Sequence, residues 1–280
     1  MAKRTSAQPA RQRLARYALA VVVSTFAVLG ATASALGAEP RSIRVELYHP
    51  GDFVSQTNTV QCVGASMQMM LNMILPGQDR TASTQLTLQR LAKSSSPPRI
   101  GPGGGEFNRP RRGASSFGWA AALTLKSGGP YRVEAANTLT GALRRAAEAM
   151  KATHRPIGLL VWHGAHAWVM SGFEATRGRN GGIGRITTVT VLDPWYPRYS
   201  GIHGASPRPG TRLTPRQLAA DFLPWQRHFR SPFDGKYVLV LPYEPDPQPQ
   251  LAVQFQPTAG PALSGASFLR PAPRLVPMPI

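Results

Sequence analysis

The chain has 280 residues, 42% of them apolar, so it is long enough for one domain with a real core. Lys and Arg number 32 against 13 Asp and Glu, a formal net charge of +19. Such a balance favours polyanionic partners, but the basic residues are scattered and accompany no binding motif, which argues against specific nucleic-acid recognition. The single cysteine, Cys62, excludes an internal disulfide.

Residues 1–37 have the layout of a secretory signal. A basic stretch precedes an apolar run over residues 17–29, and small residues then allow cleavage after Ala35 or Gly37. An uncleaved N-terminal anchor is the alternative, because the weakly apolar stretch approaches spanning length. In both cases we expect a domain that works outside the cytoplasm, as a secreted, periplasmic or membrane-anchored protein. Its positive charge suits an anionic envelope polymer or a membrane surface as a partner.

The first half of the expected domain, residues 42–243, is predicted to be mainly helical. After Cys62 the apolar residues follow helical spacing until Ile74, and Pro76-Gly77 ends the pattern. A Pro- and Gly-rich stretch over residues 94–116 is predicted to be a flexible insertion. Three further helices are predicted over residues 84–92, 117–125 and 138–150, the last with Asn137 or Thr138 as its cap.

The second half is predicted to form strands. The candidate segments are residues 157–162, 166–173, 186–192 and 236–241, with a hairpin turn at Asn180-Gly181 and a short helix at Thr214-Pro215. A helical half followed by an antiparallel sheet predicts an α+β fold. Residues 244–280 carry many prolines and almost no charge, which predicts an extended or disordered tail.

Cys62 stands at the start of a predicted helix. The unpaired N–H groups and the dipole of a first helical turn favour a thiolate, which is the form of cysteine that attacks carbonyl groups. The alternative interpretation is a small buried apolar side chain. Gln56 lies six residues before Cys62, a spacing that becomes informative below.

His166 opens one predicted strand and Asp193 closes the next. If the two strands pair as a hairpin, the carboxylate meets the imidazole at one edge of the sheet, where it could fix the tautomer of a general base. The alternatives are a structural histidine at a sheet edge and an Asp that caps the turn before Pro194.

The segments around Gln56, Cys62, His166 and Asp193 together resemble the papain-like cysteine peptidase clan. The order Cys, His, Asp is closest to the branch of bacteriocin-leader-processing peptidases, and the resemblance covers residues 45–243. It implies a papain-like fold, Cys62 as nucleophile, His166 as base, Asp193 as the residue that orients it, and Gln56 as oxyanion donor. That branch usually has Cys-Gly-Pro-Ala-Ser, so Val63 is expected to enlarge the wall beside the nucleophile.

Two further features follow from this interpretation. Trp195 resembles an aromatic residue that shields the bond between His and the acid, although a core tryptophan fits the sequence equally well. His163 lies three residues before His166, but alternation along an extended segment would point their side chains to opposite faces, so we expect no metal site. Four other histidines lack recognisable partners and are interpreted as surface or structural residues: His49, His154, His203 and His228.

The sequence therefore predicts an exported cysteine peptidase or amidase that forms a thioester on Cys62 and acts on a peptide or protein. We expect a monomer that needs no cofactor. A transglutaminase-type acyltransferase uses the same order of residues and is the first alternative. The second is a catalytically silent module that binds an anionic envelope component through its basic surface.

Overall fold

The computed structural model describes residues 42–96, 99–100, 106–107, 113–127, 129–226 and 231–245. The chain divides into one compact unit that ends at Glu244 and a second that begins at Pro245. The predicted leader over residues 1–37 lies outside the described residues, as do His228 and all but the first part of the predicted tail.

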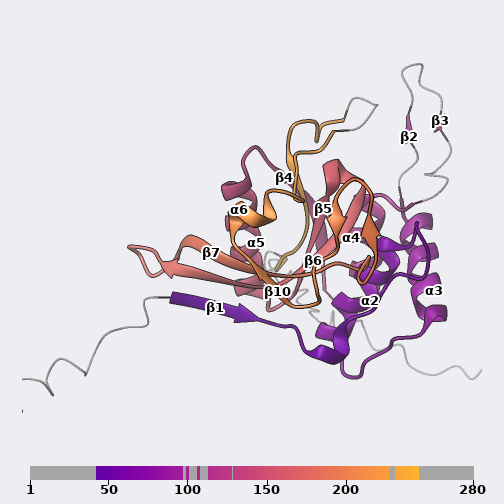
Figure 1. The fold of residues 1–280 in the computed structure, drawn as a ribbon, viewed down its shortest axis with the longest axis horizontal. Helices are drawn as coiled ribbons and strands as arrows, with labels where there is room; N and C mark the ends of the chain where they lie inside the picture. The colour runs from indigo at the N-terminus through magenta and orange to yellow at the C-terminus, as the bar shows by residue number, and fades with distance from the viewer. Residues whose placement is uncertain are drawn as a thin grey trace, which may run out of the picture. The chain divides into compact units, whose positions relative to one another are not determined.

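An antiparallel sheet, whose strands differ in length, forms the centre of the first unit. Its strands lie in the order β10, β7, β6, β5, β11, β4, and β1 pairs with the far half of β6 (Figure 1). The strand bounds are β1 Ser42–Glu46, β4 Tyr131–Ala136, β5 Ile157–Val161, β6 His166–Arg177, β7 Ile183–Leu192, β10 Thr211–Leu213 and β11 Tyr237–Pro242.

Two short pairs lie outside this sheet. They consist of β2 Arg99–Ile100 with β3 Glu106–Phe107, and β8 Tyr199–Ser200 with β9 Gly204–Ala205. The first pair belongs to the stretch that the sequence predicts to be a flexible insertion, and most of that stretch lies outside the described residues.

The helices cover both faces of the sheet. Figure 1 shows α2, α3 and α4 gathered on one side, with α5 and α6 apart from them. Their bounds are α2 Cys62–Ile74, α3 Ala82–Ser94, α4 Ser116–Ser127, α5 Leu139–Thr153 and α6 Pro215–Leu218, with single 3-10 turns η1 Pro50–Asp52 and η2 Trp162–Gly164. Within the described residues, no helix is long and apolar enough to cross a lipid bilayer.

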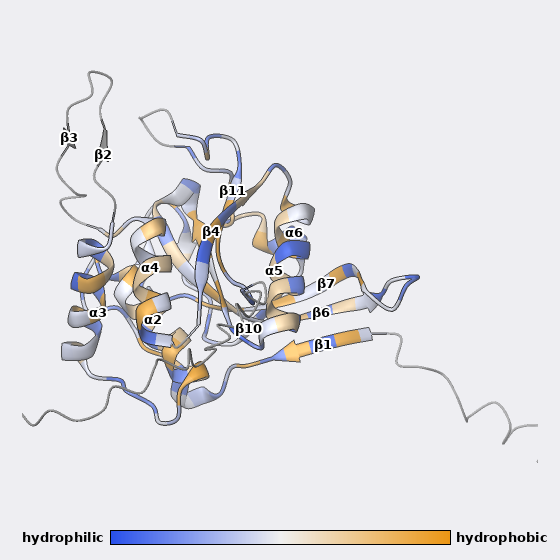
Figure 2. Cartoon of the chain, turned by 180° about the vertical axis from the view of Figure 1, so that it is seen from behind, coloured by the Kyte–Doolittle hydropathy of each residue, from blue (hydrophilic) through white to orange (hydrophobic). Residues whose placement is uncertain are grey.

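Alternation along the strands explains why two cores form. In β11, Val238 and Val240 pack with α2, α3 and α4, whereas Leu239 and Leu241 pack with α5, because successive side chains of a strand point to opposite faces. Apolar residues on both faces match a strand that is covered on both sides. In Figure 2 the turn that joins β6 and β7 is hydrophilic, as expected for a hairpin end that projects beyond the helices.

The predicted α+β class is confirmed, and each predicted helix and strand lies within a few residues of its observed position. The description of the first half as mainly helical is incomplete. β1 and β4 belong to that half and join the sheet through β6 and β11, which are far away along the chain. β4 has the sequence YRVEAA, in which Tyr131, Val133 and Ala135 alternate with two charged residues; this pattern fits a strand covered on one face, and the prediction above does not use it.

Candidate active site

Cys62 is the first residue of α2, where the backbone N–H groups have no partner within the helix. The first intrahelical bond joins the N–H of Ala65 to the carbonyl of Gln61, so the preceding amides are available to other acceptors. The N–H of Gly64 donates to Oε1 of Gln89 on α3 at 2.8 Å. The helix end therefore presents its remaining donors towards the half-buried sulfur of Cys62.

One hydrogen bond holds α2 against the strand that carries His166. The hydroxyl of Ser66, one turn after Cys62, donates to the carbonyl of Ala167 at 3.1 Å. Ser66 is fully buried, and the bond joins residues 101 positions apart in the sequence. It fixes the first turn of α2 over the start of β6, which places Cys62 beside His166.

His166 and Asp193 meet at the edge that the hairpin pairing of β6 and β7 predicts. Nε2 of His166 lies 2.7 Å from Oδ1 of Asp193, and the two side chains are 5% and 0% exposed. Asp193 also accepts from the backbone N–H of Trp195 at 2.8 Å and from the hydroxyl of Ser206. A buried carboxylate with three donors is held in one orientation, which in turn fixes the imidazole.

The pKa values of Cys62 and His166 move in opposite directions. Burial favours the neutral thiol, but the hydrogen bond and charge of His166, with the N–H groups of Ala167 and Val63, outweigh it and lower the pKa of Cys62. Burial also favours the neutral imidazole, yet hydrogen bonds and charges from Asp193 and Cys62 raise the pKa of His166 to about 9. A thiolate paired with an imidazolium is thus favoured at pH values between the pKa of Cys62 and the pKa of His166.

Gln56 is tied to the segment that follows Asp193. Its backbone N–H donates to the carbonyl of Pro194 at 2.8 Å, directly after Asp193. Its side chain is 1% exposed, and Nε2 donates to the carbonyl of Asn58 at 2.5 Å. Within the described residues Oε1 of Gln56 has no partner. The oxyanion role of Gln56 stays a prediction, because its amide is engaged by Asn58 in this structure.

A glutamine on α3 supports the loop between Gln56 and Cys62. Oε1 of Gln85 accepts from the N–H of Thr57 at 2.8 Å, and its Nε2 donates to the carbonyl of Ser55 at 3.1 Å. Gln85 is fully buried. The loop is therefore held by a side chain rather than by regular secondary structure, which sequence periodicity does not reveal.

Aromatic rings surround His166, and the sequence predicts only one of them. Trp195 stands edge-on to His166, with ring centroids 6.5 Å apart and planes at 81°. Trp162 stacks on the same imidazole at 4.3 Å and 19°, and His203 stacks on the outer face of Trp162 at 4.4 Å and 4°. His203, predicted to be a surface or structural residue, thus has a stacking partner that the sequence does not reveal.

Two other expectations need correction. Val63 is 4% exposed and packs in the core between α2, α3 and α4, so it does not form an exposed wall beside the nucleophile. His163 does not lie in an extended segment, because the chain turns at residues 162–164 and the φ of His163 is +56°. Its Nδ1 lies 2.8 Å from the carbonyl of Pro224. Among the described residues, no group of three or more His, Cys, Asp or Glu side chains could hold a metal ion.

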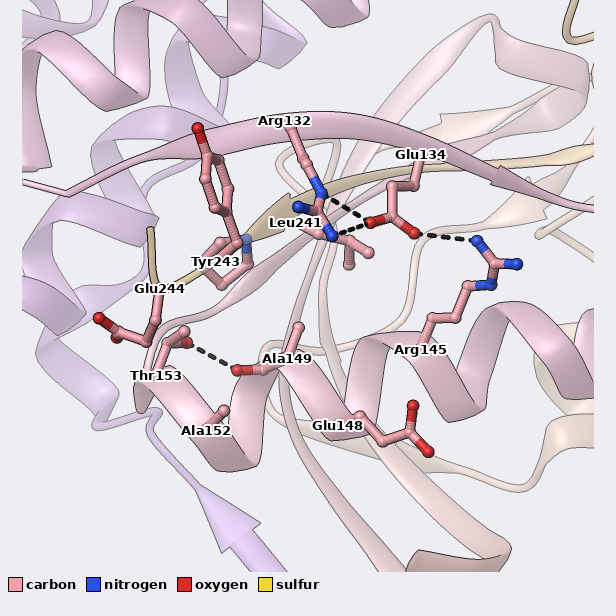
Figure 3. Close-up of a pocket in the computed structure, with 11 residues that line it drawn as sticks. Arg132, Glu134, Arg145, Glu148, Ala149, Ala152, Thr153, Leu241, Tyr243 and Glu244 are labelled. Atoms are coloured by element: carbon pink, nitrogen blue, oxygen red, sulfur yellow. Dashed lines mark hydrogen bonds and ion pairs between the residues drawn. The ribbon is translucent and has the colours of Figure 1, made fainter. Parts of the chain in front are cut away.

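A surface hollow of about 450 Å³ lies elsewhere, between α5 and the strands β4 and β11 (Figure 3). Glu134 reaches across it to Arg132 and Arg145, and Arg132 also lies over the ring of Tyr243 at 4.8 Å. None of the four predicted site residues lines this hollow.

Comparisons with known proteins give no assignment by sequence. No protein-family model matches the chain, and no curated protein matches it. Similar solved structures include a candidate C39-like peptidase from Bacillus anthracis, with 11% identity, a TM-score of 0.37, and coverage of 71% of this chain and 97% of that chain. Another is UfSP from C. elegans, with 15% identity, a TM-score of 0.40, and coverage of 74% of this chain and 38% of that chain.

Proposed function

We propose that the protein is a papain-like cysteine peptidase or amidase that cleaves a peptide bond through a thioester on Cys62. One observation carries the proposal. His166 lies 2.7 Å from Asp193 through Nε2, and against the effect of burial the same imidazole lowers the pKa of Cys62, which begins a helix. This arrangement supports Cys62 as the nucleophile, His166 as the base and Asp193 as the group that orients the base.

The reaction follows from the positions of these groups. The Cys62 thiolate attacks the carbonyl carbon, and the new C–S bond gives a tetrahedral oxyanion. His166 then donates its proton to the leaving nitrogen, so the C–N bond breaks and a thioester remains. His166 next takes a proton from water, the hydroxide attacks the thioester, and the carboxylic acid product leaves with regeneration of the Cys62–His166 pair.

The oxyanion donors belong to the same proposal. The backbone N–H of Cys62 supplies one, and Nε2 of Gln56 supplies the other once it releases the carbonyl of Asn58. Removal of one such donor typically costs on the order of 10²–10³ in rate. Export and contact with an anionic envelope polymer or membrane surface are also proposals, which the leader-like residues 1–37 and the net charge support.

The experiment combines a labelled peptide library with a fluorescent primary amine and analyses the products by mass spectrometry. Chain cleavage by the wild type, lost in Cys62→Ala and in His166→Ala, is the expected result. Incorporation of the amine at glutamine without cleavage would replace the peptidase by a transglutaminase-type acyltransferase. Failure to detect any turnover, together with ordinary thiol behaviour of Cys62 on alkylation, would leave the silent binding module as the better description.

A further inference from the structure

Trp162 occupies an unusual place in the site, between two imidazoles. Its indole lies 4.3 Å from the ring of His166 and 4.4 Å from the ring of His203, with interplanar angles of 19° and 4°. One face of the indole therefore covers His166, and His203 covers the opposite face. Both contacts are parallel stacks, whereas Trp195 meets His166 only with an edge.

Asp221 holds the indole in this position. Oδ1 of Asp221 accepts from Nε1 of Trp162 at 2.8 Å, and the carbonyl of Asp221 accepts from the backbone N–H of Trp162 at 2.8 Å. The same residue thus fixes both the main chain and the side chain. A hydrogen bond from the indole N–H to a carboxylate also leaves more electron density on the ring, which strengthens its attraction for a cation on its face.

The backbone at this point is strained, and bonds to Asp221 and Pro224 help to hold it in place. Trp162 and His163 have φ values of +54° and +56°, and Gly164 follows at +81°. A left-handed conformation is unfavourable for an L-residue with a side chain, so two in succession persist only where surrounding contacts impose them. Residues of this kind cluster at functional sites, and here the strained turn directs the indole onto His166.

The charged and titratable groups near the stack come from several elements. Cys62 on α2 and Asp193 after β7 bond to His166 directly. Asp221 and His163 face the stack from the segments around α6 and η2 and influence His203. Burial and the two nearby histidines lower the pKa of His203, so it is neutral near pH 7 and serves as a neutral cover rather than a second cation.

We propose that Trp162 is a positioning residue through which a second carboxylate, Asp221, stabilises the protonated imidazole of His166. The inference rests on the proposed function, because it concerns the proton that His166 delivers to the leaving group. The indole face attracts the imidazolium, Asp221 fixes and polarises the indole, and His203 excludes water from the outer face. Asp193 thus acts on the imidazole at its edge, through a ring nitrogen, and Asp221 acts on its face, through Trp162.

The proposal predicts a change in one part of the pH dependence only. The contact with Trp162 is present whether Cys62 is a thiol or a thiolate, provided that His166 is protonated. Its loss therefore leaves the acidic step that forms the thiolate almost unchanged. Its loss makes His166 release its proton at a lower pH, so the alkaline step moves towards neutrality. A general loosening of the site would lower reactivity at every pH instead.

The test is the rate of Cys62 alkylation by iodoacetamide in the full chain, measured from pH 4 to 10. The wild type is expected to react in two steps, because a thiolate paired with an imidazolium is a weaker nucleophile than the thiolate that remains when His166 loses its proton. In Trp162→Leu the second step should move down by about one pH unit, the size expected for loss of a desolvated cation–π contact.

Matched variants keep the test decisive if Trp162→Leu fails to fold. Trp162→Phe keeps a stacking face but loses the bond to Asp221, and Asp221→Asn keeps an acceptor but loses the charge. Both should move the second step down by less than Trp162→Leu does. His203→Phe keeps a neutral ring on the outer face and should titrate like the wild type.

The alkylation profiles distinguish an error in the proposed function from an error in the role of Trp162. A wild type with a single step near the ordinary thiol pKa of about 8.5 would refute the proposed function. A wild type with two steps, whose second step stays at the same pH in Trp162→Phe and Asp221→Asn, would overturn the role of Trp162 and leave the proposed function intact.

Discussion

Two regions of the molecule gather charged groups, and they differ in how those groups are surrounded. At the junction of α2 with β6 and β7, His166 and Asp193 are 5% and 0% exposed and every contact is directional. In the hollow of Figure 3, Arg132 and Arg145 are more than half exposed, and they share the 18% exposed Glu134.

The difference shows that a concave surface with ion pairs is not in itself a reactive site. Solvent screens the pairs of Glu134 with its exposed arginine partners, so each pair contributes little to stability. Burial around His166 removes that screening, and each hydrogen bond then changes the balance between protonated and neutral forms. Chemistry is expected where the charges are buried, and the hollow around Glu134 lies away from them.

Removal of the proposed nucleophile gives the largest expected effect. Cys62→Ala should reduce peptide cleavage by about 10⁴-fold or more, because no other group of the site can form the thioester. The measurement is the initial rate of product formation by mass spectrometry, with the unfolding midpoint as a control for the fold. Residual cleavage above about a tenth of the wild-type rate would show that another group attacks.

Removal of the base should return Cys62 to ordinary behaviour. Burial raises the pKa of Cys62, but the hydrogen bond and the charge of His166 outweigh burial and lower it. In His166→Ala the thiolate fraction at pH 6 should fall to that of a free thiol with a pKa of about 8.5, a reduction in iodoacetamide reactivity of about 100-fold. Equal rates for both proteins at pH 6 would contradict the pairing.

Asp193→Asn should move the alkaline limb of the reaction. The carboxylate contributes to the raised pKa of His166, about 9, so its loss lowers that pKa and His166 stays protonated over a narrower range. We expect the alkaline limb of the pH–rate profile to move to lower pH by about one to two units. Ser206→Ala removes only one donor to Asp193 and should cause a smaller displacement.

Gly64→Ala tests the support of the nucleophile helix. An added Cβ would lie 2.6 Å from the carbonyl oxygen of Gln85 and 2.9 Å from Cβ of Gln89, so α3 would have to move. Overpacking of this kind typically costs about 1–3 kcal/mol of unfolding free energy, which urea denaturation measures. Gly182→Ala is the matched control, because a Cβ added at this position in the hairpin turn would have no neighbour within 4 Å.

Glu134→Gln gives the smallest expected effect. The two arginines around Glu134 are exposed, so loss of both ion pairs should change the free energy of unfolding by no more than about 1 kcal/mol. The alkylation profile of Cys62 should not change at all. A displaced profile would show that the hollow and the Cys62 site are coupled, and the contrast between the two regions would then fail.

Sequence patterns are sufficient for the parts of the fold that depend on local periodicity. The α2 helix after Cys62, the hairpin of β6 and β7, and the meeting of His166 with Asp193 at its end all follow from spacing and turn residues. The alternation in β4 also fits a strand, but its partner β11 lies about 100 residues further along, so a local pattern does not reveal where β4 joins the sheet.

The surroundings of His166 are less accessible to prediction. Residues 157–162 look like one apolar strand, and nothing in them reveals that Trp162 leaves the strand with a positive φ. Ser206 and Asp221 come from later loops, and only the folded chain brings them to Asp193 and Trp162. Their roles depend on long-range packing, which a local pattern cannot encode.

The same long-range bonds have a consequence for the order in which the protein matures. A nascent chain that ends at residue 200 already contains the thiol, the imidazole and the carboxylate, but it lacks the hydroxyl of Ser206 and the anchor of Trp162 at Asp221. The complete surroundings of Asp193 and Trp162 therefore need the segments after residue 200. At mildly acidic pH we expect iodoacetamide to label the Cys62 of folded molecules faster than that of unfolded ones.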